Sequence, residues 1–506
     1  MLRRPPGWAS VLLLLWGFGG SLLPVNAQGY RLGGIVAPQL NDTTFSSDLQ
    51  RQLEQQQQQL QRRAITATLQ EAVEQSLLQN PGLAVSYTQI QQSQWNLIAV
   101  RRQWYPQLSA ASSSGSYLYA YDAVTTNRLN SNNSGFQPNT SFQNFSQVGP
   151  ALRLNWTFFD LTRGALINSA SRDLDAQKLL FDVAARNLVL ETQLIYFRLQ
   201  EQQQLIKAYE QILEITTSEL IKTVALFNAG RAAISDVEQI RTQQLQNLTI
   251  LISTYRQLVI DSANLAQFMA LPDGKLVLPK DQLAIVGEWS LSQEDTLKQA
   301  EALREEIKVS LARASSASWT STALFNRYWP QFNVGAFGSY LATNRADGMP
   351  GSGYTTNTQE SRWSKSVGVG FSWLIFDGGI NAAEAERSAY RARQFIDEAA
   401  LGRLQVAREV EQAYVSYQAS RLALKSTRQL IDSASKAAEA IRARFGIGFA
   451  DMTSVVQALN QSILAANSYA SSIREYNSAV ASLYRFSASW PGGALPLVRE
   501  RVTRLK

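Results

Sequence analysis

Residues 188–227 read LVLETQLIYFRLQEQQQLIKAYEQILEITTSELIKTVALF, and residues 406–445 read VAREVEQAYVSYQASRLALKSTRQLIDSASKAAEAIRARF. Both stretches carry a mostly apolar seam whose positions alternate in steps of four and three. The later seam runs through Val406, Val410, Ala413, Tyr417, Ser420, Leu424, Thr427, Ile431, Ala434, Ala438, Ile441 and Phe445. Subtracting 218 gives the earlier seam: Leu188, Thr192, Ile195, Leu199, Gln202, Ile206, Tyr209, Leu213, Thr216, Leu220, Thr223 and Phe227. Because this 3.5-residue spacing keeps one helix face against a partner helix, the pattern predicts a duplicated coiled-coil architecture.

The start of the chain predicts export. Arg3 and Arg4 precede a short apolar run that includes Val11 to Trp16, and Val25-Asn26-Ala27 then places small residues at the positions a signal peptidase reads. This is the pattern of a secretory signal peptide over residues 1–27, with cleavage after Ala27. The apolar run is too short for a membrane-spanning helix.

The composition excludes the commonest kinds of catalytic and metal-binding site. The 506 residues contain no cysteine and no histidine, which removes Ser-His-Asp and Cys-His catalysis, disulfides and the usual ligands of zinc and copper. The net charge is +7, or +5 once Arg3 and Arg4 leave with the signal, without a basic cluster of the kind that nucleic acid needs. We therefore expect no enzyme, no catalytic residue, no cofactor, no metal site and no nucleic-acid partner.

Two terminal segments differ from the rest in composition. Residues 28–65 include the run Gln55–Gln59 and are interpreted as a flexible leader, although Leu53 and Leu60 lie one heptad apart and would suit a helix packed on a neighbour. Residues 491–506 are interpreted as a solvated basic tail, with contact to an acidic surface as the alternative. Its basic residues are Arg499, Arg501, Arg504 and Lys506.

The chain between these ends has two repeats, at 66–271 and 291–490, joined by a linker at 272–290. Each repeat opens with helical periodicity that ends at an aromatic-proline junction, Trp104-Tyr105-Pro106 or Tyr328-Trp329-Pro330. The residue before proline is steered away from the α region, so these junctions predict a change from helix to extended chain.

Four segments of alternating polarity follow the junctions. They predict strands at about 107–121, 146–158, 331–342 and 364–376. Alternation with aromatic ends is typical of a membrane barrel strand, and an ordinary β-sandwich strand alternates as well. The intervening residues 122–145 and 342–363 are rich in Asn, Ser, Thr and Gly and are predicted to be exposed loops.

A long helix follows each strand pair. Asp160 and Asp377 stand where an N-cap belongs, and proline-free sequence continues from there to Phe227 and Phe445. About 67 helical residues span roughly 100 Å, which exceeds an ordinary globular domain. Glycine turns at about 228–236 and 446–454 then lead into return helices, so each repeat predicts an antiparallel helical hairpin. The fold class is therefore mainly α with a β portion.

Four strands are too few to close a membrane barrel, and an open strand edge is not tolerated in lipid. The strands therefore predict an oligomer. Three chains would supply 12 strands.

These features resemble the TolC family of outer-membrane efflux proteins over about residues 66–490. The motifs that carry the resemblance are Thr68-Leu69-Gln70-Glu71-Ala72-Val73 with Asn80-Pro81, Tyr105-Pro106-Gln107-Leu108, Phe376-Asp377-Gly378-Gly379 and the Phe-x-x-Gly turns. The resemblance implies a homotrimer with a 12-stranded β-barrel in outer-membrane lipid and an α-helical tunnel that extends through the periplasm. It also implies a passive exit channel of a tripartite efflux or type I secretion system, which works with a periplasmic adaptor and an inner-membrane pump.

The same resemblance suggests candidate sites at the hairpin turns. Asp236 falls on an acid of the closing network, whereas the two positions of an acidic ring fall on Ser454 and Gln457, neither of which is acidic. Asp451 lies one turn earlier and would substitute in part. Asp236 equally suits a plain acid near the N-terminus of a helix, which the helix dipole favours. The expected adaptor contacts are Gly230, Arg231, Gly448 and Phe449.

One different function class stays open at this stage, a soluble periplasmic coiled-coil adaptor or scaffold. Such proteins also carry long helical hairpins. They usually have one hairpin, however, whereas this chain has two hairpins and four alternating segments.

Overall fold

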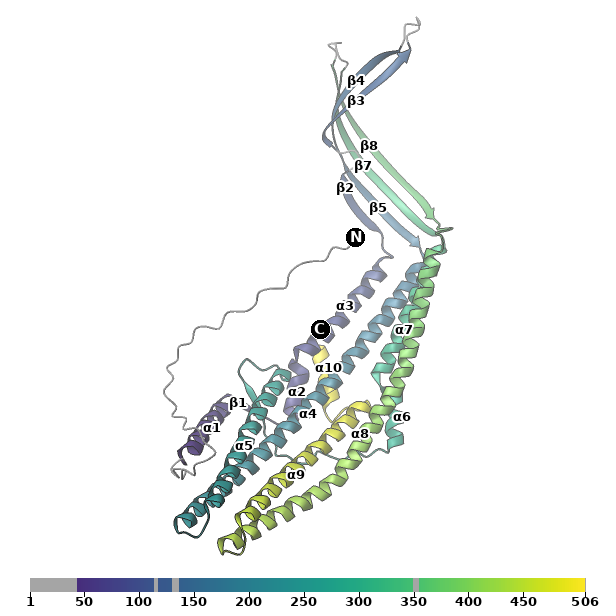
Figure 1. Ribbon diagram of the computed structural model, residues 1–506. Coiled ribbons are helices and arrows are strands. Elements are labelled where there is room, and N and C mark those ends of the chain that lie inside the picture. The colour runs from purple at the N-terminus through teal and green to yellow at the C-terminus, as the bar shows by residue number, and fades with distance from the viewer. Residues whose placement is uncertain (1–42, 113–116, 130–135, 349–354, 506) are drawn as a thin grey trace, which may run out of the picture. The chain divides into compact units, whose positions relative to one another are not determined.

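The computed structural model describes residues 43–112, 117–129, 136–348 and 355–505 (Figure 1). The predicted signal peptide and the beginning of the predicted leader lie outside the described residues. The chain divides into two units after Gln52, and the account below concerns Leu53–Lys506.

The two repeats have the same order of elements. The first contains α2 (Leu69–Gln79), α3 (Pro81–Arg102), β2 (Gln107–Ser112), β3 (Tyr117–Leu129), β4 (Phe136–Val148), β5 (Pro150–Phe159), α4 (Leu161–Asn228) and α5 (Ile234–Phe268). The second contains α6 (Gln293–Leu303), α7 (Glu305–Phe325), the 3-10 turn η1 (Asn326–Tyr328), β7 (Gln331–Gly348), β8 (Thr355–Ser372), α8 (Ile380–Gly446) and α9 (Met452–Phe486). Outside the repeats lie α1 (Thr43–Arg63), β1 (Ala64–Ala67), β6 (Leu276–Pro279) and α10 (Ala494–Leu505).

Local sequence explains where these helices begin. Thr68 and Glu71 form a reciprocal capping box at the start of α2, and the side chain of Asn80 accepts from two backbone amides of α3. Asp160 is the N-cap of α4, as predicted. Asp377 is not the N-cap of α8, because Gly379 holds that position in a left-handed conformation. The Asp377 carboxylate still accepts from the amides of Gly379 and Asn381, so it stabilises the same helix end from two residues upstream.

The strands form one antiparallel sheet around β7. Along one side β7 pairs with β8 over its whole length, from Gln331 opposite Ser372 to Gly348 opposite Thr355. Along the other side, its first half pairs with β5 and its second half with β4. β2 then pairs with β5, and β3 pairs with β4. The outer side of β8 and the outer sides of β2 and β3 have no strand partner within the part of the chain that the structure describes.

The strands extend farther into the predicted loops than expected, so the loops predicted at 122–145 and 342–363 are largely wrong. At its other end β8 stops at Ser372, before the predicted residue 376. β3 continues to Leu129, β4 already begins at Phe136, and β7 and β8 extend their pairing beyond residue 342. Side-chain alternation fades in these extensions because both faces are polar there. Pairing of the backbones continues nevertheless, and the hydroxyls of Thr125 and Thr140 bond across it at 3.0 Å.

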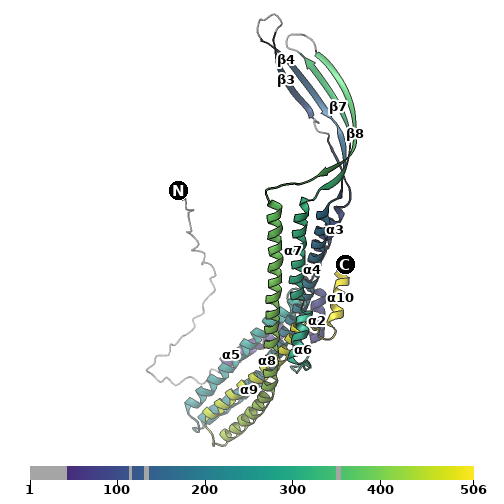
Figure 2. The ribbon, with the colours of Figure 1, turned by 90° about the vertical axis from the view of Figure 1, so that its right-hand side faces the viewer.

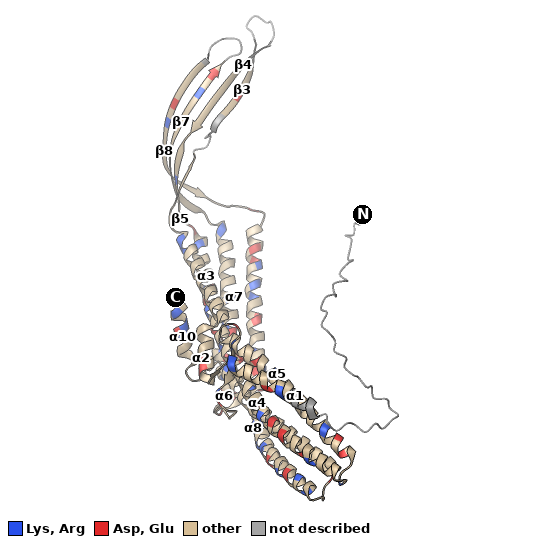
Figure 3. Ribbon diagram, turned by 90° about the vertical axis from the view of Figure 1, so that its left-hand side faces the viewer, with Lys and Arg blue, Asp and Glu red and all other residues tan. Residues whose placement is uncertain are grey.

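One face of the sheet near the helices is apolar and uncovered. Val367, Val369 and Phe371 on β8 are 80%, 74% and 69% exposed, and glycine occupies the positions between them. Figure 3 shows that charged residues are sparse on these strands and frequent along the long helices. Among the described residues, no helix is both long enough and apolar enough to cross a membrane.

The helices pack side by side in an order that changes along their length. Next to the strands the order is α3, α4, α7 and α8, and next to the hairpin turns it is α5, α4, α9 and α8 (Figure 2). Every seam position of α4 from Leu188 to Thr223 is buried, which confirms the earlier seam. The later seam on α8 is buried from Val406 to Ser420 and mostly half-buried beyond.

Both terminal segments are more ordered than predicted. Residues 43–63 form α1, and Leu53 and Leu60 are only 7% and 8% exposed, so the flexible-leader interpretation is wrong for the part after Gln52. The predicted basic tail is also wrong, because residues 494–505 form α10 with Val498 buried. Arg501 points inward and donates to the carbonyl oxygens of Leu78 and Asn80 at the end of α2.

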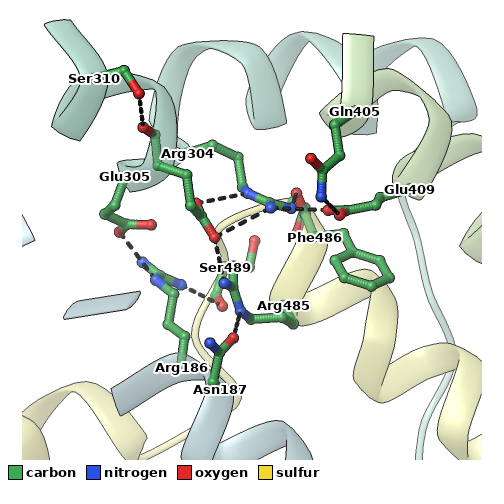
Figure 4. A network of polar contacts seen from close by, with 12 residues as sticks. Arg186, Asn187, Arg304, Glu305, Ser310, Gln405, Glu409, Arg485, Phe486 and Ser489 are labelled. Carbon is green, nitrogen blue, oxygen red and sulfur yellow. Dashed lines mark hydrogen bonds and ion pairs between the residues drawn. The ribbon is translucent and has the colours of Figure 1, made fainter. Parts of the chain in front are cut away.

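A buried ionic network joins four helices where the two repeats meet (Figure 4). Nε of Arg186 on α4 donates to Glu305 at 3.0 Å, with both side chains at most 10% exposed. Arg304, between α6 and α7, donates to both carboxylate oxygens of Glu306 at 3.0 and 3.2 Å and to Glu409 on α8 at 2.9 Å. Since removing one partner of a buried pair leaves an uncompensated charge, this network holds the helices in one arrangement.

Asp182, one helical turn before Arg186, makes the stability of this region depend on pH. Burial raises the pKa of its carboxyl to about 6, and the charge of Glu305 adds to the rise. The folded protein therefore holds this proton more tightly than the unfolded chain does, so stability falls as the pH rises from about 4 to about 6.

We expect Asp182→Asn to remove this dependence. The variant should gain roughly 1–2 kcal/mol at pH 7, a value discounted for partial exposure, and almost nothing at pH 4. Thermal unfolding followed by circular dichroism at both pH values measures the gain. Asp432→Asn, at an exposed position of α8, is the control, and an equal response of the two variants would contradict the assignment.

Candidate functional site

The two hairpin turns, which we call the first tip (residues 228–236) and the second tip (residues 446–454), have the same backbone geometry. Gly230 and Gly448 have φ values of +69° and +79°, the left-handed region that favours glycine. Arg231 N donates to Leu226 O at 2.8 Å, and Phe449 N donates to Arg444 O, also at 2.8 Å. These bonds close the ends of α4 and α8, as the glycine positions predict.

The acid at each tip caps the return helix, but it occupies a different capping position in each tip. In the first tip Asp236 lies in the first turn of α5, and its carboxylate accepts from Ala233 N at 2.9 Å. In the second tip Asp451 is itself the N-cap of α9, and its carboxylate accepts from Ser454 N at 2.8 Å. Asp451 lies 218 positions after Ala233, and Ser454 lies 218 positions after Asp236. Each repeat therefore keeps one half of a reciprocal capping box.

Hydrogen bonds also affect the charge at the second tip. Bonds from the hydroxyl and the backbone amide of Ser454 lower the pKa of Asp451 below its usual value. This carboxylate is therefore ionised at neutral pH, and it stands at the positive end of the α9 dipole. Ser454 is half-buried and Gln457 is exposed, so the predicted ring positions carry uncharged polar groups.

The surfaces of the two tips differ. In the second tip Ile447 and Phe449 are 71% and 73% exposed on either side of Gly448. The first tip instead exposes Gly230 and Arg231. Ile447 is not among the adaptor contacts predicted from the sequence, although apolar residues alternate with glycines in Phe445-Gly446-Ile447-Gly448-Phe449.

The structure brings the two return helices together just behind the tips. The amide of Gln239 on α5 donates to the hydroxyl of Thr453 on α9 at 3.4 Å. One turn further, the amides of Gln243 and Asn460 bond to each other in both directions at 2.9 and 3.1 Å. These contacts could not be predicted from the sequence, because nothing in the sequence of one helix shows which side chain of the other hairpin it will contact.

A buried acid near the tips was missed as well. Glu219 on α4 is 2% exposed and accepts from Arg442 on α8. Glu219 stands in the sequence beside the seam residues Thr216, Leu220 and Thr223. This position could have predicted a buried ion pair, since an acid at the border of a buried helix face needs a partner of opposite charge.

The site offers interaction surfaces and ionic contacts between helices. Among the described residues there is no group of three or more His, Cys, Asp or Glu side chains that could hold a metal ion. The tips combine exposed groups at the turns with polar bonds between the hairpins.

Comparisons with known proteins agree with this architecture. The sequence pattern of the family described as outer membrane efflux protein matches residues 72–271 and 296–489. Among curated proteins, none matches the chain.

Three solved structures show the similarity of fold. The outer-membrane channel OprN has a TM-score of 0.66 at 18% identity, over 83% of this chain and 90% of that chain. The CmeC outer membrane channel of Campylobacter jejuni has a TM-score of 0.65 at 15% identity, over 87% and 90%. The open state of the MtrE outer membrane channel of Neisseria gonorrhoeae has a TM-score of 0.60 at 15% identity, over 83% and 89%. The resemblance predicted from the sequence motifs is confirmed.

We expect Asp451→Ala to loosen the first turn of α9, because the amide of Ser454 loses its acceptor. Amide hydrogen exchange of residues 452–455 should become several-fold faster, and Asp451→Asn, which keeps an oxygen acceptor, should exchange like the wild type. Equal exchange in the alanine variant would show that Asp451 is not a functional cap.

Proposed function

The chain belongs to the outer membrane efflux protein family, and on that premise we propose that three copies form a passive exit channel. The channel would lead from the periplasm to the exterior as the outer-membrane part of a tripartite efflux pump or type I secretion system. The strands would form a closed barrel in the outer membrane, and the helices would form a tunnel in the periplasm. The observation that carries the proposal is that neither edge of the sheet has a strand partner within the part of the chain that the structure describes.

In lipid, the backbone groups at the edge of a sheet need hydrogen-bond partners from another strand. Each backbone N–H and C=O group left without a hydrogen bond in the hydrocarbon region costs several kcal/mol, so a spanning sheet has to close on itself. The described chain contributes four extended runs with an apolar face near the helices. β8 of one copy would pair with β2 and β3 of the next, and three copies would close a barrel of 12 strands. The number three comes from the resemblance to the TolC family.

A channel function agrees with the composition. A passive conduit needs no nucleophile, metal or nucleotide site, and the energy for transport would come from an inner-membrane pump joined through a periplasmic adaptor. The alternative, a soluble periplasmic adaptor or scaffold, leaves the exposed face of Val367, Val369 and Phe371 without a role.

The tips would form the periplasmic entrance. A solved structure is described as the open state of the MtrE channel, which supports an entrance that can open. Opening here would separate the two hairpins behind the tips. Asp236 and Asp451 would support the entrance by fixing the first turns of α5 and α9. Ser454 and Gln457 would face the passage as uncharged groups.

The exposed turns would receive the adaptor. In the first tip, Gly230 exposes its backbone and Arg231 exposes a positively charged side chain. In the second tip, Gly448 lies between the exposed Ile447 and Phe449. An adaptor with a mixed apolar and acidic tip would fit this surface.

We expect the mature protein, purified in detergent, to contain three chains per particle. Light scattering that separates protein mass from detergent mass tests this, because a closed barrel would need more than one chain and the resemblance to the TolC family gives the number three. A monomer that stays monomeric in several detergents would overturn the channel and favour the periplasmic scaffold.

We also expect the wild-type channel to have weak cation selectivity, because its proposed ring positions are uncharged. Ser454→Asp together with Gln457→Asp would add six negative charges per trimer at the entrance and raise the cation preference several-fold. The reversal potential in planar bilayers under a salt gradient measures this preference. Ser318→Asp with Thr322→Asp, near the strand end of α7, adds the same charge elsewhere, and an equal shift in both variants would contradict the position of the entrance.

A further inference from the structure

A groove of about 550 Å³ lies between α1, α4, α5 and the segment that follows β6. Its volume falls within the roughly 300–1,000 Å³ that is typical of ligand sites. Glutamine is the commonest residue of its lining, with six side chains from three segments that are far apart in the sequence. These are Gln57, Gln61, Gln200, Gln203, Gln204 and Gln282.

Contacts within the chain hold the walls of this groove in place. β1 pairs in parallel with β6, which fixes the chain directly after α1. Nε of Arg63, at the end of α1, donates to Gly274 O at 2.8 Å. After β6, the carboxylate of Asp281 accepts from the hydroxyl of Tyr196 at 2.9 Å. The groove is therefore formed before a ligand enters it, which reduces the entropy cost of binding.

The most buried polar residue of the lining is Gln200, which is 4% exposed. Its Nε2 donates to the carbonyl oxygens of Asp281 and Gln282 at 3.1 and 3.2 Å. Its Oε1 is buried and has no hydrogen-bond partner among the residues that the structure describes. A buried acceptor without a donor costs free energy, so a hydroxyl or N–H group of a ligand that reached Gln200 would be bound favourably.

The charged groups of the groove leave two cations to meet a ligand. Within the described part of the chain, Lys207 and Lys280 are exposed and neither forms an ion pair. The carboxylate of Glu210, by contrast, already accepts from the amide of Gln57 at 3.1 Å and from the hydroxyl of Tyr255 at 2.7 Å. The groove therefore favours an anionic ligand over a cationic one.

The lining also has an apolar part. Leu60, Ile206 and Leu258 line the groove and are between 3% and 8% exposed as whole residues. A ligand that fits must then combine apolar patches with many groups that both donate and accept hydrogen bonds, because each glutamine amide does both. Sugar hydroxyls have this property, and the C–H faces and acetamido methyl groups of an N-acetylated sugar supply the apolar patches.

We propose that this groove binds an acidic, N-acetylated glycan. The glutamine amides would bond to its hydroxyl and acetamido groups, and Lys207 and Lys280 would pair with its carboxylates. The leucines and Ile206 would contact its apolar faces. This inference goes beyond the proposed channel and does not depend on it, because all the lining residues belong to one chain.

The test is calorimetric titration of the mature protein in detergent with a tetrasaccharide of alternating N-acetylglucosamine and N-acetylmuramic acid, whose lactyl groups carry carboxylates. Chitotetraose, which is N-acetylated but neutral, should bind about five-fold more weakly, as the loss of exposed ion pairs implies. Tetraglutamate, an acidic peptide, should not bind measurably. No binding of the acidic tetrasaccharide would overturn the proposal, and equal or tighter binding of chitotetraose or of tetraglutamate would overturn the ligand class.

Two matched pairs of variants locate the site. Gln61→Glu adds a carboxylate to the groove and should weaken binding about five-fold or more, whereas Gln59→Glu adds the same charge at an exposed position of the same helix outside the lining. Lys207→Gln should also weaken binding about five-fold. Its control is Lys178→Gln, since Lys178 is 57% exposed on the same helix and its ion pair with Asp175 stays within α4. Equal affinities within both pairs would overturn the site.

Amide hydrogen exchange gives a readout that does not rely on affinity. A ligand in the groove would join α1 to α4, so the saturating tetrasaccharide should slow exchange of residues 53–63 several-fold in the wild type and in Gln59→Glu. At the same concentration Gln61→Glu should show little protection. Unchanged exchange in the wild type would overturn the proposal. A protein that binds the glycan but does not trimerise would instead overturn the proposed function and leave this inference standing.

Discussion

The two edges of the sheet, which have no strand partner among residues 43–112, 117–129, 136–348 and 355–505, are the constraint on which the rest of this architecture depends. A strand edge presents a row of N–H and C=O groups that must find partners, and in lipid water cannot supply them. The chain passes from sheet to helix through Asp160 alone after β5 and through residues 373–379, which include Asp377, after β8. Because the first turn of each long helix is fixed to a strand end, any arrangement that the strands adopt also determines where the helices stand.

The helical part is held by polar contacts as much as by apolar packing. Within the first hairpin, the buried amide of Gln202 donates to Asp261 at 2.7 Å, and Gln244 donates to Thr217 at 2.8 Å. Such bonds contribute modest free energy but cost much when broken, so they favour one register of two long helices over slipped alternatives. The buried network around Arg304 does the same where the repeats meet.

The sequence predicted what is periodic and local. The duplicated seam, the long helices, the glycine turns and the N-cap at Asp160 follow from spacing and from residue type, and the structure has them. The polar extensions of the strands were missed, because backbone pairing does not need alternation once both faces are polar. The ordered α10 was missed for a different reason. Arg501 acquires its partners at Leu78 and Asn80, more than 400 positions away, and composition alone made it look like a solvated charge.

The same limit applies to the tips, where the two repeats share a backbone but differ in surface. The capping acid has moved from the first turn of the helix in the first tip to the N-cap in the second, so both turns stay rigid with different side chains exposed. The second tip exposes Ile447 and Phe449, whereas the first exposes Arg231. In a trimer the two kinds of tip would alternate around the entrance. A partner would then meet three apolar and three basic contacts in turn, and a docking protein would bind in register only if its own surface alternated in the same way.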